Sequence, residues 1–220
     1  MSEVVGPTRD QIDAARERIA PHVRRTPVLD VAAGTFGIAW PLTLKLELLQ
    51  VTGSFKPRGA FNRMLTAGVG PAGVVAASGG NFGLAVGHAA RELGHHAEIF
   101  VPSTSPAAKI EKVRATGAAW MHPFDQPEVV AGQGTIGLEL SEQAPDADTV
   151  LVAVGGGGLI AGIASWFAGH DLRVVGVEPV TSRCLQASLE AGGPVDVPVS
   201  GRAADSLGTR RAGDIAFAVA

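Results

Sequence analysis

"TVLVAVGGGGLIAGIASWFAG", residues 149–169, is the stretch that decides the fold class. It carries no charged residue, and hydropathy alone is typical of a membrane-spanning helix. Its four consecutive glycines argue against one continuous helix, because each glycine costs a helix roughly 1 kcal/mol relative to alanine. The apolar, β-branched run before the glycines is typical of a buried strand. We therefore predict a strand over 149–154, a glycine turn over 155–158 and a helix over 159–169.

The same alternation of short apolar runs with helical patterns continues along the chain. Thr8 and Gln11 form a capping box that starts a first helix, with Ile12, Ala15 and Ile19 on one face. Further strands are predicted over 42–49, 73–77, 97–101 and 172–178, and further helices over 55–65, 81–93, 106–117, 127–143 and 182–192. Apolar strands between helices are typical of a mostly parallel sheet with helices on both faces. The predicted class is α/β.

Composition limits the partners and the compartment. Hydrophobic residues make up 46% and charged residues 18%, which is typical of a globular chain. A net charge of −3 gives no general attraction to nucleic acid or to anionic membranes, so we expect small-molecule partners or copies of the same chain. Cys184 is the only cysteine, and residues 1–11 lack the basic and apolar segments of a signal peptide. We therefore expect a cytoplasmic protein.

Three glycine-bearing turns each follow a predicted strand. They are "TGSFKPRGA" (52–60), "SGGNFG" (78–83) and "GGGGL" (155–159). In a parallel sheet the carboxyl ends of the strands lie on one rim, and ligands collect there. We therefore expect the three turns to open on the same rim.

The glycine turn over Gly155, Gly156, Gly157 and Gly158 predicts an anion site. Without β-carbons these residues can adopt positive φ and direct successive N–H groups inward at the start of a helix. A phosphate group is the expected guest. A tight turn without a ligand is the alternative, although one glycine would usually suffice for that.

A second interpretation of the same turn stays open. Gly156, Gly158 and Ala161 match a dinucleotide fingerprint, and Glu178 follows about twenty residues later, where it would hold a ribose hydroxyl. This pattern alone favours an NAD-dependent oxidoreductase.

Lys56 argues for different chemistry. Ser54 is a candidate N-cap and Pro57 suits the first turn, so Lys56 lies where a helix start disfavours positive charge. Partial burial beside Phe55 would lower the pKa of Lys56 further and yield a neutral amine that attacks an aldehyde. A reactive lysine together with a phosphate site indicates pyridoxal 5'-phosphate. Asn81 is a candidate helix cap and a side-chain amide for a ring oxygen.

These motifs resemble those of the fold-type II pyridoxal-phosphate enzymes, in particular the serine/threonine dehydratase (threonine ammonia-lyase) family. The resemblance lies in "TGSFKPRGA", "ASGGNFGLAVGHAARELG", "VAVGGGGLIAGIA", "VVGVEP" and "ADSLGTRRAGDIAF", and spans nearly the whole chain. It implies mostly parallel twisted sheets, with a large domain formed by residues 1–50 and 122–220 and a shortened small domain formed by residues 51–121. It also implies a homodimer.

The resemblance further implies roles for single residues. Lys56 would carry the cofactor as a Schiff base and Phe55 would pack on its ring. Asn81 would hold the ring 3-oxygen. Four consecutive amides would hold the phosphate, those of Gly155, Gly156, Gly157 and Gly158. Five residues would hold the substrate carboxylate, namely Thr52, Ser78, Gly79, Gly80 and Asn81. The implied reaction is β-elimination of L-threonine or L-serine to a 2-oxo acid and ammonia.

Several positions depart from the family pattern. Gly79 stands where racemising relatives carry a serine, so racemase activity is not expected, and Phe82 replaces a histidine. Cys184 stands where metal-binding relatives carry a second acid, so no metal is assigned. The family pattern also includes a strand-helix segment between Ala119 and Trp120 and a part after Ala220. A truncated, non-catalytic cofactor-binding protein therefore stays an alternative.

Overall fold

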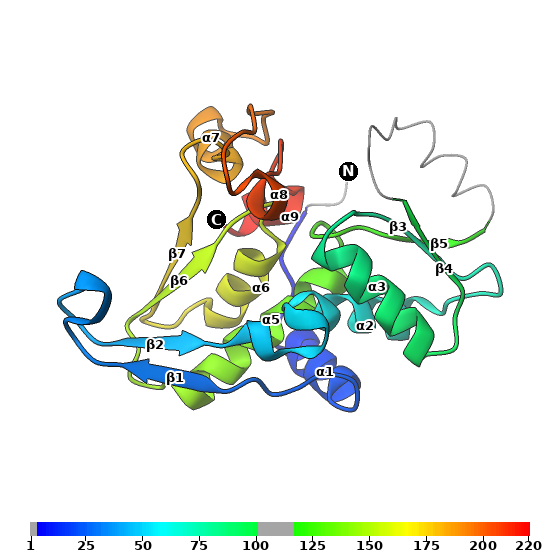
Figure 1. Cartoon of the computed structure of the whole chain (residues 1–220), viewed down its shortest axis with the longest axis horizontal. Helices are drawn as coiled ribbons and strands as arrows, with labels where there is room; N and C mark the ends of the chain where they lie inside the picture. Colours follow the sequence, from blue (N-terminus) through cyan, green and yellow to red (C-terminus); the bar gives the residue numbers. More distant parts are fainter. Residues whose placement is uncertain (1–3, 101–116) are drawn as a thin grey trace.

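The computed structural model describes residues 4–100 and 117–220 (Figure 1). Its helices are α1 (Arg9–Ile19), α2 (Lys56–Ala67), α3 (Asn81–Glu92), α5 (Pro127–Gln143), α6 (Gly158–Phe167), α7 (Cys184–Ala191), α8 (Ala204–Leu207) and α9 (Asp214–Val219). Its strands are β1 (Val28–Val31), β2 (Leu42–Lys45), β3 (Val74–Ala77), β4 (Ala97–Phe100), β5 (Ala119–Met121), β6 (Thr149–Ala153) and β7 (Arg173–Val177). Short 3₁₀ turns are η1 (Thr35–Gly37), η2 (Glu47–Leu49) and η3 (Val51–Gly53). The helix predicted over 106–117 lies outside the described residues except for its last position.

The α/β class is confirmed, and the strands form three sheets. Parallel strands in the order β4-β3-β5 form one sheet, and β6 pairs in parallel with β7 in another. β1 pairs antiparallel with β2 in a hairpin. The prediction that three glycine turns share the rim of one sheet is wrong, because β2, β3 and β6 belong to different sheets.

The predicted strand over 42–49 is too long. β2 ends at Lys45, and the chain then forms η2. Glu47 turns its carboxylate to the buried Arg58 side chain, at 2.8 Å between Oε1 and Nη2. The partner strand β1 has no prediction, because Val28–Val31 is short and follows a proline.

Helix α5 joins the two larger hydrophobic cores. It packs against α6 on one side and against α1 and α2 on the other (Figure 1). Close approach depends on glycines, because a β-carbon at Gly132 would lie 2.5 Å from the Arg58 carbonyl oxygen. A β-carbon at Gly162 would lie 2.5 Å from the backbone nitrogen of Gly134. One core surrounds α6 and the other surrounds α2 and α3, so α5 fixes the two relative to each other.

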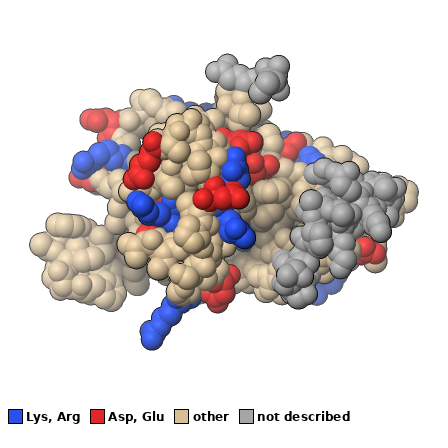
Figure 2. All heavy atoms as spheres, turned by 90° about the horizontal axis from the view of Figure 1, so that it is seen from above, with Lys and Arg blue, Asp and Glu red and all other residues tan. Residues whose placement is uncertain are grey.

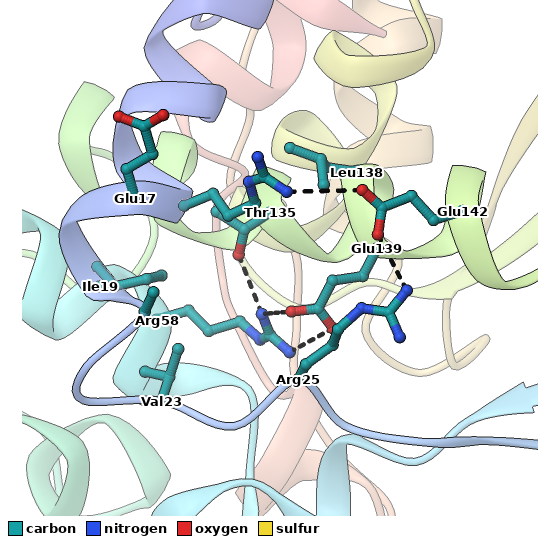
Figure 3. A pocket seen from close by; sticks show the side chains of 11 residues that line it. Glu17, Ile19, Val23, Arg25, Arg58, Thr135, Leu138, Glu139 and Glu142 are labelled. Carbon is teal, nitrogen blue, oxygen red and sulfur yellow. Dashed lines mark hydrogen bonds and ion pairs between the residues drawn. The ribbon is translucent and has the colours of Figure 1, made fainter.

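A buried ion network holds α2 against α5. The Arg58 guanidinium is 1% exposed and donates to the carboxylates of Glu47 and Glu139 and to the Thr135 hydroxyl. Lys45 also donates to Glu139. Figure 3 shows Arg58, Thr135 and Glu139 beside a cavity of about 380 Å³ that contains none of the predicted site residues. The network therefore fixes the first turn of α2, where Lys56 lies.

The surface fits the composition. On the face drawn in Figure 2, Lys and Arg side chains lie among Asp and Glu side chains instead of gathering into a patch of one sign. Among the described helices, none has the length and apolar character needed to cross a membrane. Residues 149–169 form β6, the glycine turn and α6, as predicted.

Candidate active site

Lys56 is the first residue of α2, and its amine lies in a largely apolar setting. Nζ donates a hydrogen bond to the Pro123 carbonyl oxygen at 3.0 Å. It lies 4.9 Å from the ring centroid of Phe55 and 5.7 Å from that of Phe82. Burial lowers the pKa of the Lys56 amine to about 8. A substantial fraction of this amine is therefore neutral near physiological pH.

The predicted cap of this helix is wrong. Phe55, not Ser54, occupies the N-cap position of α2. The Ser54 hydroxyl is buried, and it makes no hydrogen bond to any part of the chain that the structure describes. Pro57 lies in the first turn as predicted, where its missing N–H costs nothing. A shift of one residue in the helix start moved the hydroxyl away from the helix amides.

The glycine turn is shaped by close packing more than by positive φ. Of its four residues only Gly157 has positive φ, at 91°. A β-carbon at Gly156 would overlap the ring of Phe124, and one at Gly158 would lie 2.5 Å from the Phe124 carbonyl oxygen. Helix α6 begins at Gly158, so its unpaired first-turn N–H groups open toward the turn. The predicted anion site therefore has the bare backbone that it requires.

The carboxylate residues predicted in the first two turns lie together, with one exception. Thr52, Ser78, Gly79 and Gly80 line a cavity of about 570 Å³. Asn81 is exposed and is not among the residues that line this cavity. Its predicted capping role is wrong, because Gly80 is the N-cap of α3 and Asn81 is the first helical residue.

Thr52 has an unusual backbone and an unpaired hydroxyl. Its φ is 64°, a left-handed conformation that non-glycine residues rarely adopt. Its Oγ1 is buried and has no hydrogen-bond partner within residues 4–100 and 117–220. A strained residue that presents an unpaired hydroxyl to a cavity is suited to bind a ligand.

The segment His122–Asp125 connects these parts, and sequence reasoning missed it. Pro123 accepts the hydrogen bond from Lys56, and the next residue, Phe124, packs against Gly156 and Gly158. The lysine and the glycine turn therefore lie on either side of one short segment. A signal was present, because "HPFD" places an aromatic and two ionisable residues between a strand and a helix that starts at Pro127.

Glu178 and Cys184 have structural partners. The Glu178 carboxylate accepts the N–H groups of Leu185 and Gln186 at the start of α7, both at 2.9 Å. This engagement removes the feature that favoured a dinucleotide site. The Cys184 thiol donates to the Gly155 carbonyl oxygen at 3.2 Å, and burial raises the pKa of Cys184 to about 11. In the described part of the chain, no three His, Cys, Asp or Glu side chains cluster as a metal site would require.

Comparison with known proteins agrees with this arrangement. The chain is 37% identical over 239 residues to a putative threonine dehydratase of Sinorhizobium fredii, covering 94% of the chain and 71% of the relative. It is 36% identical to an L-threonine ammonia-lyase of Thermotoga maritima, covering 96% of the chain and 60% of the relative. A crystal structure of a threonine deaminase, from the organism abbreviated T.th., superposes with a TM-score of 0.86 at 40% identity, covering 97% of the chain and 76% of that structure.

The chain thus spans roughly three fifths to three quarters of the length of these relatives. The family model described as "pyridoxal-phosphate dependent enzyme" matches residues 19–121 and 116–220. The two matched pieces meet where the resemblance implied a further strand-helix segment. Together they cover nearly the whole sequence, and the chain belongs to the family of pyridoxal-phosphate dependent enzymes.

Proposed function

We propose that the protein catalyses the β-elimination of L-threonine or L-serine to a 2-oxo acid and ammonia. The observation that carries the proposal is the buried amine of Lys56, whose pKa is about 8, held across a short segment from a bare glycine turn. The similarity to a threonine dehydratase and an L-threonine ammonia-lyase supports this choice of substrate class. An oxidoreductase would leave the lysine without a role.

The described residues fit pyridoxal phosphate. The glycine turn offers N–H groups without side chains at the start of α6, which suits a phosphate. Lys56 offers a largely desolvated amine, which suits an aldehyde. Thr52 offers a buried hydroxyl, unpaired within the described residues, beside the cavity, which suits a carboxylate. Each of these three features is otherwise a cost to the folded protein.

Each predicted residue has a role in holding the cofactor. Gly155, Gly156, Gly157 and Gly158 would hold the phosphate through their amides. Lys56 would hold the aldehyde carbon, the Phe55 ring would pack on the cofactor ring, and the Asn81 amide would bind the ring oxygen. Bound there, pyridoxal phosphate supplies an electron-withdrawing ring that acidifies the Cα–H of the amino acid.

The chain's own groups then position the substrate and move its proton. Thr52 and the backbone of Ser78, Gly79 and Gly80 hold the substrate carboxylate in the cavity of about 570 Å³. The neutral amine of Lys56 takes the Cα proton, since a base works best when its pKa lies near the working pH. The Pro123 carbonyl oxygen accepts a hydrogen bond from the resulting ammonium. The apolar ring of Phe82 limits water around Lys56.

Two measurements test the proposal in order. Addition of pyridoxal phosphate is expected to give a visible absorption band that is lost in Lys56→Ala. The control is Lys45→Arg, which keeps a cation beside Glu139 and should keep the band. Release of ammonia and a 2-oxo acid from L-threonine or L-serine then separates an enzyme from a protein that only binds the cofactor. A band without turnover contradicts the proposed reaction, and a thermal shift with NAD instead of a band contradicts the proposed cofactor role.

We also propose that the protein is a cytoplasmic homodimer. Leu151, Val175 and Val177 are exposed by 62%, 40% and 49%, and together they give β6 and β7 an apolar surface that a second copy would cover. Sedimentation equilibrium should return the mass of two chains, and the mass of one chain would contradict the dimer. The reduced, buried state of Cys184 fits a reducing compartment, which cell fractionation tests.

A further inference from the structure

Residues 122–126 form a turn that is closed by its own side chains. The His122 ring accepts at Nδ1 from the backbone N–H of Asp125 at 2.9 Å. The Gln126 side-chain oxygen accepts from the His122 N–H at 2.7 Å, and the Gln126 amide donates to the Trp120 carbonyl at 3.0 Å. The ring of Phe124 contacts the ring of His122 at 4.6 Å between centroids. Because these contacts lock the turn internally, it is expected to move as a unit.

Asp125 ties this turn to the beginning of α9. Its Oδ1 accepts the N–H of Ile215 at 3.0 Å, and its Oδ2 accepts the N–H of Asp214 at 3.2 Å. These are first-turn amides that have no partner within their own helix, and a carboxylate there is also favoured by the helix dipole. Asp125 therefore fixes the position of the turn 122–126 relative to α9.

Helix α9 in turn holds the glycine turn. The Gly213 N–H donates to the Gly156 carbonyl oxygen at 3.0 Å. A β-carbon at Gly157 would overlap the Ala216 side chain. The start of α9, the glycine turn and the turn 122–126 thus meet at one junction, and Asp125 is the charged group that joins two of the three.

We propose that Asp125 is a positioning residue for the reacting amine: by holding the turn 122–126 on α9, it keeps the Pro123 carbonyl against Lys56 and Phe124 against the glycine turn. Asp125 itself touches neither Lys56 nor the glycine turn in the contacts described above. The inference rests on the proposed function only in taking Lys56 as the reacting amine.

Loosening the turn changes the amine in a predictable direction. Loss of the Pro123 acceptor alone would lower the pKa of Lys56, whereas entry of water would raise it. Burial is the cause of the lowered pKa, so the hydration effect wins. In Asp125→Ala, the pKa of Lys56 should therefore rise from about 8 toward 10.5.

The test measures that amine in the whole chain without cofactor or substrate. Competitive acylation across pH, with mass spectrometry of the Lys56 peptide, gives the pKa of the amine directly. Asp125→Asn keeps one acceptor oxygen and should show a smaller rise than Asp125→Ala. Lys45 serves as an internal reference, because it contacts Glu139 and Gln143 and should not respond. This result is independent of turnover, so it can fail while the proposed function stands.

Thr8→Ala is the matched control. Thr8 caps α1 through a capping box, so its loss also weakens a helix start, but far from the junction in sequence and without contact to it. It should lower the melting temperature without changing the acylation pKa of Lys56. An unchanged pKa in a folded Asp125→Ala protein overturns the proposal. If Asp125→Ala does not fold, an unchanged pKa in Asp125→Asn overturns it equally.

Discussion

Thr52 combines a strained backbone with a hydroxyl that the described part of the fold leaves unpaired. A left-handed conformation costs a non-glycine residue about 1–3 kcal/mol, which outweighs the roughly 0.5–1 kcal/mol of extra chain entropy that glycine loses on folding. Thr52→Gly should therefore stabilise the protein by about 1 kcal/mol in urea denaturation. It should also raise KM for the amino acid, because the hydroxyl beside the cavity is lost.

Phe36 offers the matched comparison. Its φ is 56°, and it lies 74% exposed in η1, away from the predicted site residues in sequence. Phe36→Gly should give a similar gain in stability with no change in KM. If Thr52→Gly raises stability without raising KM, Thr52 does not bind the substrate.

Lys56 should make stability depend on pH. Its amine loses its proton above about pH 8 in the folded protein, but only near 10.5 in the unfolded chain. The unfolded chain therefore binds more protons in this window, and the free energy of unfolding rises with pH through it.

Replacing the lysine should remove this dependence. Lys56→Met should be more stable than the natural chain by about 1–2 kcal/mol at pH 7, and this advantage should shrink by about 1 kcal/mol at pH 9. Urea denaturation at the two pH values measures both numbers. Cys184, whose pKa is raised to about 11, is common to both proteins and cancels in the difference. An advantage that does not change with pH would mean that the Lys56 amine titrates normally.

Single residues were predictable where chemistry selects a residue type. A lysine at a helix start and four glycines after a strand are costly to keep, and the structure gives both an environment that uses them. The predicted caps Ser54 and Asn81 failed for a different reason. A cap depends on the helix start to within one residue, and tertiary packing decides that start.

At the scale of elements, the junction of the glycine turn with Phe124 gives a steric prediction. A β-carbon at Gly156 would overlap the Phe124 ring, whereas one at Gly155 meets nothing closer than 3.4 Å. Gly156→Ala should therefore lower stability by about 1–3 kcal/mol, the usual cost of overpacking, and should weaken pyridoxal-phosphate binding. Gly155→Ala should cost much less stability. Equal stability losses, measured by urea denaturation, would contradict the packing shown here.

The contact between α2 and α5 gives an electrostatic prediction. Arg58→Met leaves Glu47 and Glu139 short of a buried partner and should cost about 3–5 kcal/mol. Arg25 lies beside the same cavity in Figure 3 and pairs with Glu142 at an exposed position. Arg25→Ala should cost less than about 1 kcal/mol. Urea denaturation of the two variants checks the contrast, and similar costs would mean that the buried network contributes little.

Element types were largely predictable, and some boundaries were not. The prediction of a helix over 127–143 matches α5, because Pro127 and a long apolar pattern mark it clearly. The strand over 42–49 was too long because its alternating pattern continues into η2, where Glu47 is turned inward by Arg58. A side chain eleven residues ahead decides that boundary, and local periodicity carries no information about it.

For the whole molecule, periodicity indicated the α/β class but could not distribute strands among sheets. Parallel pairing joins strands that are distant in sequence, such as Val74 with Ala119, and nothing local specifies the partner. The sequence therefore predicted one rim where the structure has three sheets. The site is assembled instead by the segment His122–Asp125, which bridges the lysine and the glycine turn.

That bridge spans two hydrophobic cores, one under α2 and α3 and the other under α6. A molecule bound covalently at Lys56 and gripped at the glycine turn would act as a rivet between them. Scanning calorimetry without pyridoxal phosphate should show two separate melting steps, and saturation with it should merge them into one at higher temperature. Cooperativity of unfolding would then report the joining of the two halves before any catalysis is measured.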